Sequence, residues 1–556
     1  MSNRKRIVAS IGFVFSTSVH AIAAQVAPVG THPYAPGLDA QQYDVAIQLP
    51  ARGGAISATS VLTFSRAMRV TTLTLDLMAL TVDEVRVNGT PRDIVRDSAT
   101  IRVPLTQRDG TQLRVSVRYH GSPTDGLIIR EDSVRGWSAF GDNWPARARY
   151  WLPTIDHPSD KARVNWTVTA PASRTVLANG TQISRTVVPK AIGDSVTWAV
   201  TTFRMSQPIP TYLMVIGVAP LTETTLGRTA CGAATGGGCV PQSVWTFAQE
   251  VPTMPGNFRE AGAIVKFFAE KVGPFAYDRL SHVQSATRFG GMENATAIFY
   301  SDNAFRTNDV GVSLIAHETA HQWFGDAVTP RRWQDLWLSE GFATYFAALY
   351  TQRSRGDSAF RAELARIREA VISAPIVVQR PVVDSVGANE PITLLNRNSY
   401  EKGGLVLHML RRSIGDRAFF GALREYQRRF RNGTATTDDL RLILEHHTHK
   451  SLKPFFSQWL HRPGFAELTI SYNWRPATHI LMLQVTQSVR FAPYALPLTL
   501  AIRDAQGLES LVRVDVKALA SQIIRVPVNG VDEVASVMAD PNVDALARVT
   551  LLRVER

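Results

Sequence analysis

Cysteine is scarce in this chain: its 556 residues include only Cys231 and Cys239, which flank a glycine-rich loop. The sequence indicates no histidine partner for either cysteine, so we do not expect a catalytic cysteine nucleophile. In an oxidising compartment we expect the two cysteines to form one local disulfide that closes the loop. Two free thiols are the alternative.

A membrane-spanning run is also missing. The apolar stretch from Ile7 to Val19 is too short to cross a bilayer, and no later segment is long and apolar enough. This stretch follows three basic residues, 4–6, and precedes Ala21-Ile-Ala23, which is the pattern of a secretory signal peptide. We therefore expect residues 1–24 to be a cleavable signal peptide, no transmembrane segment, and a secreted or periplasmic protein.

Internal repeats, low-complexity tracts and nucleic-acid-binding modules are absent as well. The formal charge is +13, but the basic residues are spread along the chain, so nucleic acid is not an expected partner. Hydrophobic residues make up 45% and charged residues 19%, as in an ordinary globular protein. The length predicts about three domains. Nothing in the sequence indicates the oligomeric state.

Hydrophobic periodicity divides the chain into three parts. Alternating β-branched stretches, such as Tyr43 to Leu49, predict an N-terminal antiparallel β domain over residues 25–245. Helical periodicity then predicts a mostly helical domain over residues 246–464. Short strands return after Gly464 and predict a small C-terminal β-sandwich over residues 465–556.

The strongest chemical signal is His-Glu-Thr-Ala-His at residues 317–321. On a helix, His317 and His321 project from one face and can share one cation. Glu340, which is separated from His321 by eighteen residues and lies on a second helical pattern, completes a catalytic zinc ligand set with one open position. Glu318 points beside the metal, where it can take a proton from water. A chance match on an amphipathic helix is the alternative, and Glu340 argues against it.

Two further motifs carry a family resemblance. Gly290-Gly-Met-Glu-Asn294 and Tyr400-Glu-Lys-Gly403 flank the zinc helices in the order and spacing of the gluzincin aminopeptidases, the aminopeptidase N family. The chain resembles this family over roughly residues 40–470. The resemblance implies a thermolysin-like catalytic domain, one zinc ion as cofactor, and peptide substrates with a free N-terminus.

The resemblance also implies roles for individual residues. Glu293 would pair with the substrate's α-ammonium, and Glu340 would help to hold it. Tyr400 would donate a hydrogen bond to the developing oxyanion. Gly290 and Gly291 would let an extended substrate add as a strand. Taken alone, Glu293 could be a surface strand residue and Tyr400 an ordinary buried tyrosine. The expected substrate-binding set is Phe289, Gly290, Gly291, Met292, Glu293, Asn294, Asp142 and Trp144.

One position departs from the family pattern. Where many relatives place a Gln or Glu that contacts the substrate amine, this chain has Trp144. Asp142 could supply the missing acceptor, or Trp144 could shape the pocket or stack on a cation.

Asp326 is expected either to orient a zinc-binding imidazole or to cap the helix end. The histidines at 446, 447 and 449 are interpreted as an exposed helix end rather than a second metal site.

These observations favour a zinc metalloaminopeptidase in which Glu318 moves the proton, and Tyr400 and zinc stabilise the oxyanion. A zinc endopeptidase is one alternative, but an acidic amine anchor at Glu293 would serve no purpose at an internal bond. An epoxide hydrolase on the same scaffold is a second alternative. A non-catalytic peptide-binding relative is the third, although no expected ligand or base is missing here.

Overall fold

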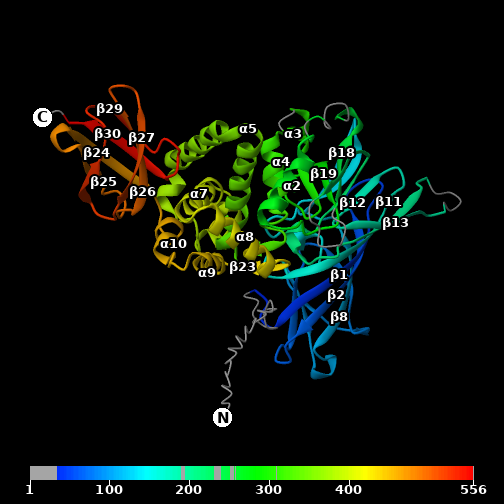
Figure 1. Cartoon of the computed structure of the whole chain (residues 1–556). Helices are drawn as coiled ribbons and strands as arrows, with labels where there is room; N and C mark the ends of the chain where they lie inside the picture. Colours follow the sequence, from blue (N-terminus) through cyan, green and yellow to red (C-terminus); the bar gives the residue numbers. More distant parts are fainter. Residues whose placement is uncertain are drawn as a thin grey trace, which may run out of the picture.

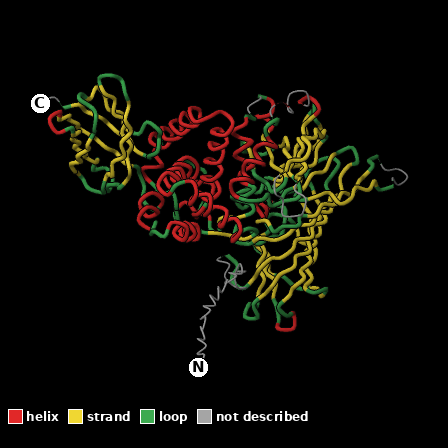
Figure 2. Tube along the Cα trace, viewed as in Figure 1, coloured by secondary structure: helices red, strands yellow, loops and turns green. Residues whose placement is uncertain are grey.

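The computed structural model describes residues 34–189, 195–230, 239–250, 256, 258–307 and 310–554. An N-terminal β part, a central helical part and a C-terminal β part follow one another along the chain, as predicted (Figure 1). Strands gather at the two ends of the molecule and helices lie between them (Figure 2). The expected signal peptide and Cys231 lie outside the described residues, so the signal peptide and the disulfide stay predictions.

The N-terminal part is built around a large mixed sheet in the order β13-β14-β11-β1-β2-β8-β4-β5, with β15 paired to β11. In β1, Tyr43, Val45 and Ile47 are buried while the residues between them are more exposed, which is the period-two pattern of a half-buried strand. The predicted antiparallel pairing is interrupted once, because β1 runs parallel to β11. The strands of this sheet are β1 (Leu38–Gln48), β2 (Ile56–Arg66), β4 (Thr81–Val87), β5 (Thr90–Pro91), β8 (Gln112–Gly121), β11 (Lys161–Pro171), β13 (Thr181–Val187), β14 (Trp198–Arg204) and β15 (Ile209–Pro210).

Two smaller sheets complete the N-terminal part. One has the order β12-β16-β10-β9 and the other β3-β7-β6. Their strands are β3 (Thr72–Asp76), β6 (Val95–Arg96), β7 (Thr100–Pro104), β9 (Leu127–Asp132), β10 (Gly136–Gly141), β12 (Thr175–Ala178) and β16 (Ile216–Ala219).

A five-stranded sheet, in the order β17-β18-β19-β21-β20, lies next to the first helices. Its first two strands come from residues that we expected in the N-terminal domain, yet β18 pairs in parallel with β19 of the central part. We therefore propose that the central part begins near Leu221 rather than at residue 246. The strands are β17 (Leu221–Ala230), β18 (Cys239–Phe247), β19 (Leu280–Ser285), β20 (Gly291–Met292) and β21 (Ala297–Ser301).

The central part is mostly helical, as predicted. Its longest helix, α5, contains a break at Gly356, where φ is +85°. The short strands β22 (Val328–Pro330) and β23 (Gly433–Ala435) pair in parallel beneath the helices. Among the described residues, no helix is long and apolar enough to span a membrane. The helices are α2 (Ala261–Val272), α3 (Asp302–Arg306), α4 (Val312–His321), α5 (Trp337–Ser373), α6 (Pro375–Gln379), α7 (Gly403–Ile414), α8 (Asp416–Phe430), α9 (Thr437–Thr448) and α10 (Lys453–Leu460).

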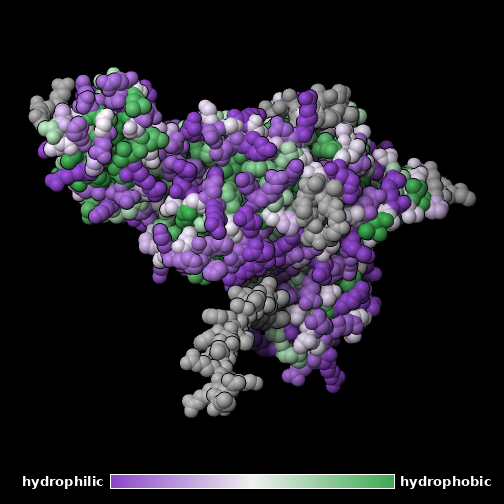
Figure 3. Space-filling view, in the orientation of Figure 1, coloured by the Kyte–Doolittle hydropathy of each residue, from purple (hydrophilic) through white to green (hydrophobic). Residues whose placement is uncertain are grey.

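The C-terminal part consists of two sheets, β28-β25-β24-β30 and β27-β26-β29, as expected for a small sandwich. Figure 3 shows hydrophobic residues gathered on the surface of this part, where Leu511, Ile523 and Met538 are exposed. The strands are β24 (Ala466–Arg475), β25 (Ile480–Gln487), β26 (Leu496–Asp504), β27 (Glu509–Val516), β28 (Ser521–Pro527), β29 (Val534–Ala539) and β30 (Ala547–Arg553).

Candidate active site

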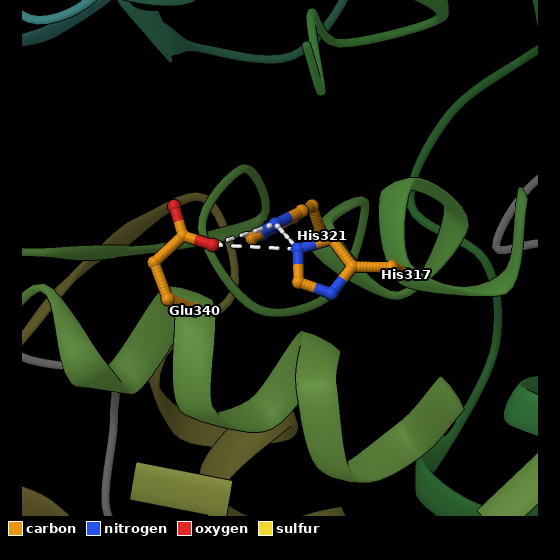
Figure 4. A group of neighbouring side chains, drawn as sticks. All are labelled: His317, His321 and Glu340. Atoms are coloured by element: carbon orange, nitrogen blue, oxygen red, sulfur yellow. Dashed lines mark hydrogen bonds and ion pairs between the residues drawn. The ribbon is translucent and has the colours of Figure 1, made fainter. Parts of the chain in front are cut away.

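Three predicted metal ligands meet where the end of α4 faces the start of α5. The Nε2 atoms of His317 and His321 lie 3.2 Å apart, and Glu340 Oε2 lies 3.4 Å from the first and 3.3 Å from the second (Figure 4). His321 and Glu340 are buried, and His317 is only slightly exposed. The i,i+4 spacing on α4 therefore places both imidazoles on the face that Glu340 meets.

The triangle formed by these three atoms has the dimensions of a tetrahedral zinc site. With zinc–ligand bonds of about 2.0–2.1 Å, neighbouring ligand atoms of a tetrahedron lie about 3.3–3.4 Å apart. Glu340 Oε2 is buried and has no hydrogen-bond donor among the described residues. Burial opposes ionisation of Glu340, but the two histidines outweigh it and lower its pKa to about 2. A cation would satisfy this buried carboxylate.

The side chain of His321 is held in its orientation by contacts at Nδ1, the ring nitrogen that does not face the other two ligands. Its Nδ1 lies 3.1 Å from the carbonyl oxygen of Phe324 and 2.9 Å from Ser339 Oγ. An Nδ1–H that donates there leaves the Nε2 lone pair free for a metal. The chain returns to His321 through Gly325, whose φ is +125°. A Cβ at this position would lie 3.2 Å from His321 Nδ1, so the turn needs a glycine.

Glu318 packs against the backbone of the short edge strand β20. A Cβ added to Gly291 would lie 2.7 Å from Glu318 Cγ and closer still to its carboxylate, whereas a Cβ on Gly290 would meet nothing within 4 Å. Among the described strands β20 pairs only with β21, and it forms the edge of its sheet. An edge strand beside the triad can pair with an extended chain.

A cavity of about 570 Å³ opens over the triad. Its size is that of a site for a small molecule or a few peptide residues. Glu293 lines it and is buried, and burial raises the pKa of Glu293 to about 7. Burial also raises the pKa of Glu318 well above its ordinary value. The lining residues are Trp144, Phe289, Gly290, Gly291, Met292, Glu293, Gly311, Ser313, Leu314, His317, Glu318, His321, Glu340, Leu395 and Tyr400.

Tyr400 lies on a π-helical turn, Asn398–Lys402, that leads directly into α7. Its ring stacks on His317, with 5.9 Å between the ring centroids and 8° between the planes. Burial, together with nearby carboxylates such as Glu340, raises the pKa of Tyr400 well above its ordinary value, so its hydroxyl stays protonated. The start of α7 packs closely against α5 at Gly341 and Gly403. A Cβ on Gly341 would lie only 3.0 Å from Gly403 Cα, so this contact leaves no room for a side chain.

Comparisons with known proteins agree on one family. The Peptidase M1 N-terminal domain matches residues 40–213, and the Peptidase family M1 domain matches residues 258–459. The chain belongs to peptidase family M1. This result and the fold confirm the resemblance and the fold class that the sequence predicted.

Several curated relatives of this M1 chain are named as aminopeptidases. They include probable aminopeptidase 2 of Sulfurisphaera tokodaii, 27% identical over 59% of this chain and 41% of that protein. The leucyl aminopeptidase of Saccharolobus solfataricus is 24% identical over 78% of this chain and 55% of that protein. The glutamyl aminopeptidase of Rattus norvegicus is 28% identical over 64% and 38%. The chain thus spans about half the length of the curated relatives it matches.

This chain covers a larger share of solved M1 structures than of the curated relatives. A Glu-to-Ala mutant of the M1 zinc metallopeptidase from Deinococcus radiodurans, bound to a Tyr-Ser-Ala substrate, matches with a TM-score of 0.64 at 26% identity. The match covers 77% of this chain and 95% of that chain. A two-domain M1 zinc metallopeptidase bound to L-arginine matches with a TM-score of 0.65 at 25% identity and the same coverage. One zinc ion is thus the cofactor of this M1 chain, and the triangle of His317, His321 and Glu340 fits it.

The predicted substrate-binding residues divide into two groups in the M1 site. Trp144, Phe289 and residues 290–293 line the cavity, whereas Asp142 and Asn294 do not. Asp142 is fully buried; its carboxylate accepts a hydrogen bond from Thr287 at 3.0 Å and pairs with Arg147 at 2.9 Å. Its carboxylate is therefore already engaged, and Asp142 is not among the residues that line the cavity. Asn294 is also fully buried.

Trp144 instead forms part of an aromatic wall. Its ring meets Phe289 and Trp333 edge-on, with centroid distances of 5.9 Å and 5.6 Å.

Among the described residues, Asp326 makes no hydrogen bond to either imidazole. Its carboxylate accepts a hydrogen bond from Gln322 at 2.8 Å. Ser339 and the Phe324 carbonyl orient His321 instead, and the sequence analysis missed both. The sequence offers one indication of a role for Ser339, which is that it directly precedes the metal ligand Glu340.

Proposed function

We propose that this chain is a zinc aminopeptidase that releases the first residue from peptides with a free N-terminus. The observation that carries the proposal is the cavity itself. A buried carboxylate that is not a metal ligand, Glu293, lies in the same cavity as the His317–His321–Glu340 triad, Glu318 and Tyr400. The names of the M1 relatives support the same activity.

Glu293 sets which end of the peptide enters. Its carboxylate is buried and lines the cavity, where a cationic α-ammonium can compensate its charge. Glu340 lines the same cavity and would contribute to holding this ammonium. With the ammonium fixed, the first peptide bond falls beside the metal ligands, which raises its effective concentration there.

The first side chain would then lie against the aromatic wall of Trp144 and Phe289. This surface favours an apolar or aromatic first residue over a charged one. The rest of the peptide would extend along β20, where Gly290 and Gly291 leave the backbone accessible.

Glu318 moves the proton. It accepts a proton from the attacking water and passes it to the leaving amine, so one carboxylate serves as general base and then as general acid. Tyr400, held as a neutral phenol, donates its hydrogen bond to the oxygen of the carbonyl under attack. The zinc ion, when bound, supplies Lewis-acid chemistry that acidifies water and polarises a carbonyl.

A pair of peptides tests this proposal. The zinc-loaded protein should release the first residue from a free peptide and should not cleave the same peptide after N-acetylation. A chelator and the Glu318→Gln variant should each abolish the release. Cleavage of both peptides at an internal bond would establish an endopeptidase instead. Hydrolysis of neither peptide would contradict the proposal and leave an epoxide hydrolase or a peptide-binding role.

A further inference from the structure

A second set of metal-ligating side chains lies away from the active site, between α8 and α9. Three atoms, Glu425 Oε2, one nitrogen of His446 and one of His447, lie within 4.8 Å of one another. Glu425 comes from α8 and the two histidines from the last turn of α9, and these helices pack side by side (Figure 1). We propose that Glu425, His446 and His447 bind a divalent transition metal ion such as zinc.

The ligand chemistry is that of the catalytic site. Two imidazoles and one carboxylate suit zinc and its neighbours in the first transition row. His446 offers Nδ1, 3.4 Å from Glu425 Oε2, and His447 offers Nε2, 2.7 Å from the same oxygen. A single carboxylate oxygen therefore already faces both imidazole nitrogens.

The backbone of α8 is shaped to admit the His447 ring. Gly421 lies one turn before Glu425, and a Cβ there would lie 3.1 Å from His447 Nδ1. A larger residue would press on the ring and tilt Nε2 away from Glu425. Arg424, the basic neighbour of Glu425, donates instead to the carbonyl oxygen of Lys271 at 3.0 Å.

A simple ion pair between the helices is the rival explanation. The 2.7 Å contact between Glu425 and His447 is a direct hydrogen bond, so a metal must replace its proton and separate the two atoms by about half an ångström. The side chains can make this movement because His446 is 72% exposed and the other two are partly exposed. The ion pair, however, uses His446 only weakly, since its Nδ1 lies 3.4 Å from Glu425 Oε2, which is longer than a hydrogen bond of ordinary strength.

A bound metal would join α8 to α9 near the outer end of the helical part. The open positions on its exposed side would be filled by water, so this ion would be structural or regulatory and would not require the catalytic cavity. The sequence pattern alone favoured an exposed helix end. Only the fold brings Glu425 to the two histidines.

Zinc binding by the full chain, with no other ligand added, tests the second metal site. The full chain is stripped of metal and equilibrated with zinc buffered at a low micromolar free concentration, and bound zinc is counted per chain after desalting. We expect about two zinc ions in the wild type and about one in His446→Ala, a substitution of an exposed residue that leaves the fold intact. His447→Ala should also bind one, and the control His449→Ala should bind two.

A second measurement locates each ion. Anomalous scattering at the zinc edge should place one ion at His317–His321–Glu340 and one between α8 and α9, and the latter should vanish in His446→Ala. Peptide hydrolysis by His446→Ala should stay unchanged, which separates this site from the catalytic zinc. One zinc per chain in both the wild type and His446→Ala, with no anomalous peak at Glu425, would overturn the proposal.

Discussion

The carboxylate of Glu318 occupies the space that a side chain at Gly291 would fill. The two residues lie on different elements, α4 and β20, and the cavity lies directly above them. The glycine thus does more than leave β20 open to a peptide, because it also fixes where the proposed base can rest.

The two neighbouring glycines should respond differently to substitution. Gly291→Ala pushes the Glu318 carboxylate away from its position, and a displacement of about 1 Å at such a site lowers kcat roughly 100-fold. Gly290→Ala, whose Cβ meets nothing, should keep kcat within a few fold. Steady-state kinetics on one peptide measure both. Equal losses in the two variants would show that Gly291 acts only through the backbone of β20.

Glu293 and Asp142 should separate substrate binding from stability. Glu293→Gln removes the charged partner of the substrate amine and should lower kcat/KM about 10- to 100-fold. Asp142→Asn breaks a buried pair with Arg147 and should lower the melting temperature, with little change in KM for the folded enzyme. A large rise in KM in Asp142→Asn would place the amine at Asp142 after all.

Ser339 should tune the affinity for zinc. In Ser339→Ala, His321 Nδ1 keeps only the Phe324 carbonyl as partner, and we expect a loss of about tenfold in zinc affinity. Ser373→Ala, at an exposed position near the end of α5, is the control and should bind zinc normally. Competition with a zinc chelator measures both affinities. Unchanged affinity in Ser339→Ala would show that the carbonyl alone orients the imidazole.

Lys402 should make stability depend on pH. Burial, with a smaller effect of Arg462, lowers its pKa from 10.5 to about 7 in the folded chain. Between pH 7 and 10.5 the unfolded chain binds this proton and the folded chain does not, so the contribution of Lys402 to stability rises with pH. Lys402→Met should therefore raise the melting temperature most below pH 7, and the gain should shrink towards pH 10.

Lys161 provides the matched comparison. Its amine is also buried, but it donates to the carbonyl oxygens of Asp326, Ala327 and Gly433 at 2.8–3.2 Å. The Lys402 amine, by contrast, donates to the carbonyl oxygen of Arg462 at the longer distance of 3.4 Å. Lys161→Met leaves these buried acceptors without a donor and should lower the melting temperature. Thermal unfolding of both variants between pH 6 and 10 measures the difference. A Lys402→Met variant that is less stable than wild type below pH 7 would show that its ammonium is satisfied in the folded chain.

The metal ligands could be predicted because their chemistry follows local periodicity. The spacing of His317 and His321 fixes a shared helix face, and Glu340 is recognisable on the next helix. The roles of Ser339 beside His321 and of Gly291 beside Glu318 could not be predicted in this way, because they depend on contacts between α4 and other elements. Asp142 is a similar case: its sequence position suggested a substrate contact, whereas the fold shows its carboxylate engaged by Thr287 and Arg147.

The boundaries between parts were harder to predict than the parts themselves. The sequences of β17 and β18 have the same alternating pattern as the N-terminal strands, so nothing local shows that β18 pairs with β19. The pairing of Glu425 with His446 and His447 likewise depends on how α8 packs against α9. Periodicity gives the type of each element, whereas its neighbours depend on tertiary packing.

The order in which a peptide is shortened tests the central claim most directly. A free decapeptide without proline is incubated with the zinc-loaded protein, and mass spectra are taken over time. The account predicts a ladder of products that each lack one more residue from the N-terminus. Internal fragments, or a ladder from the C-terminus, would contradict it.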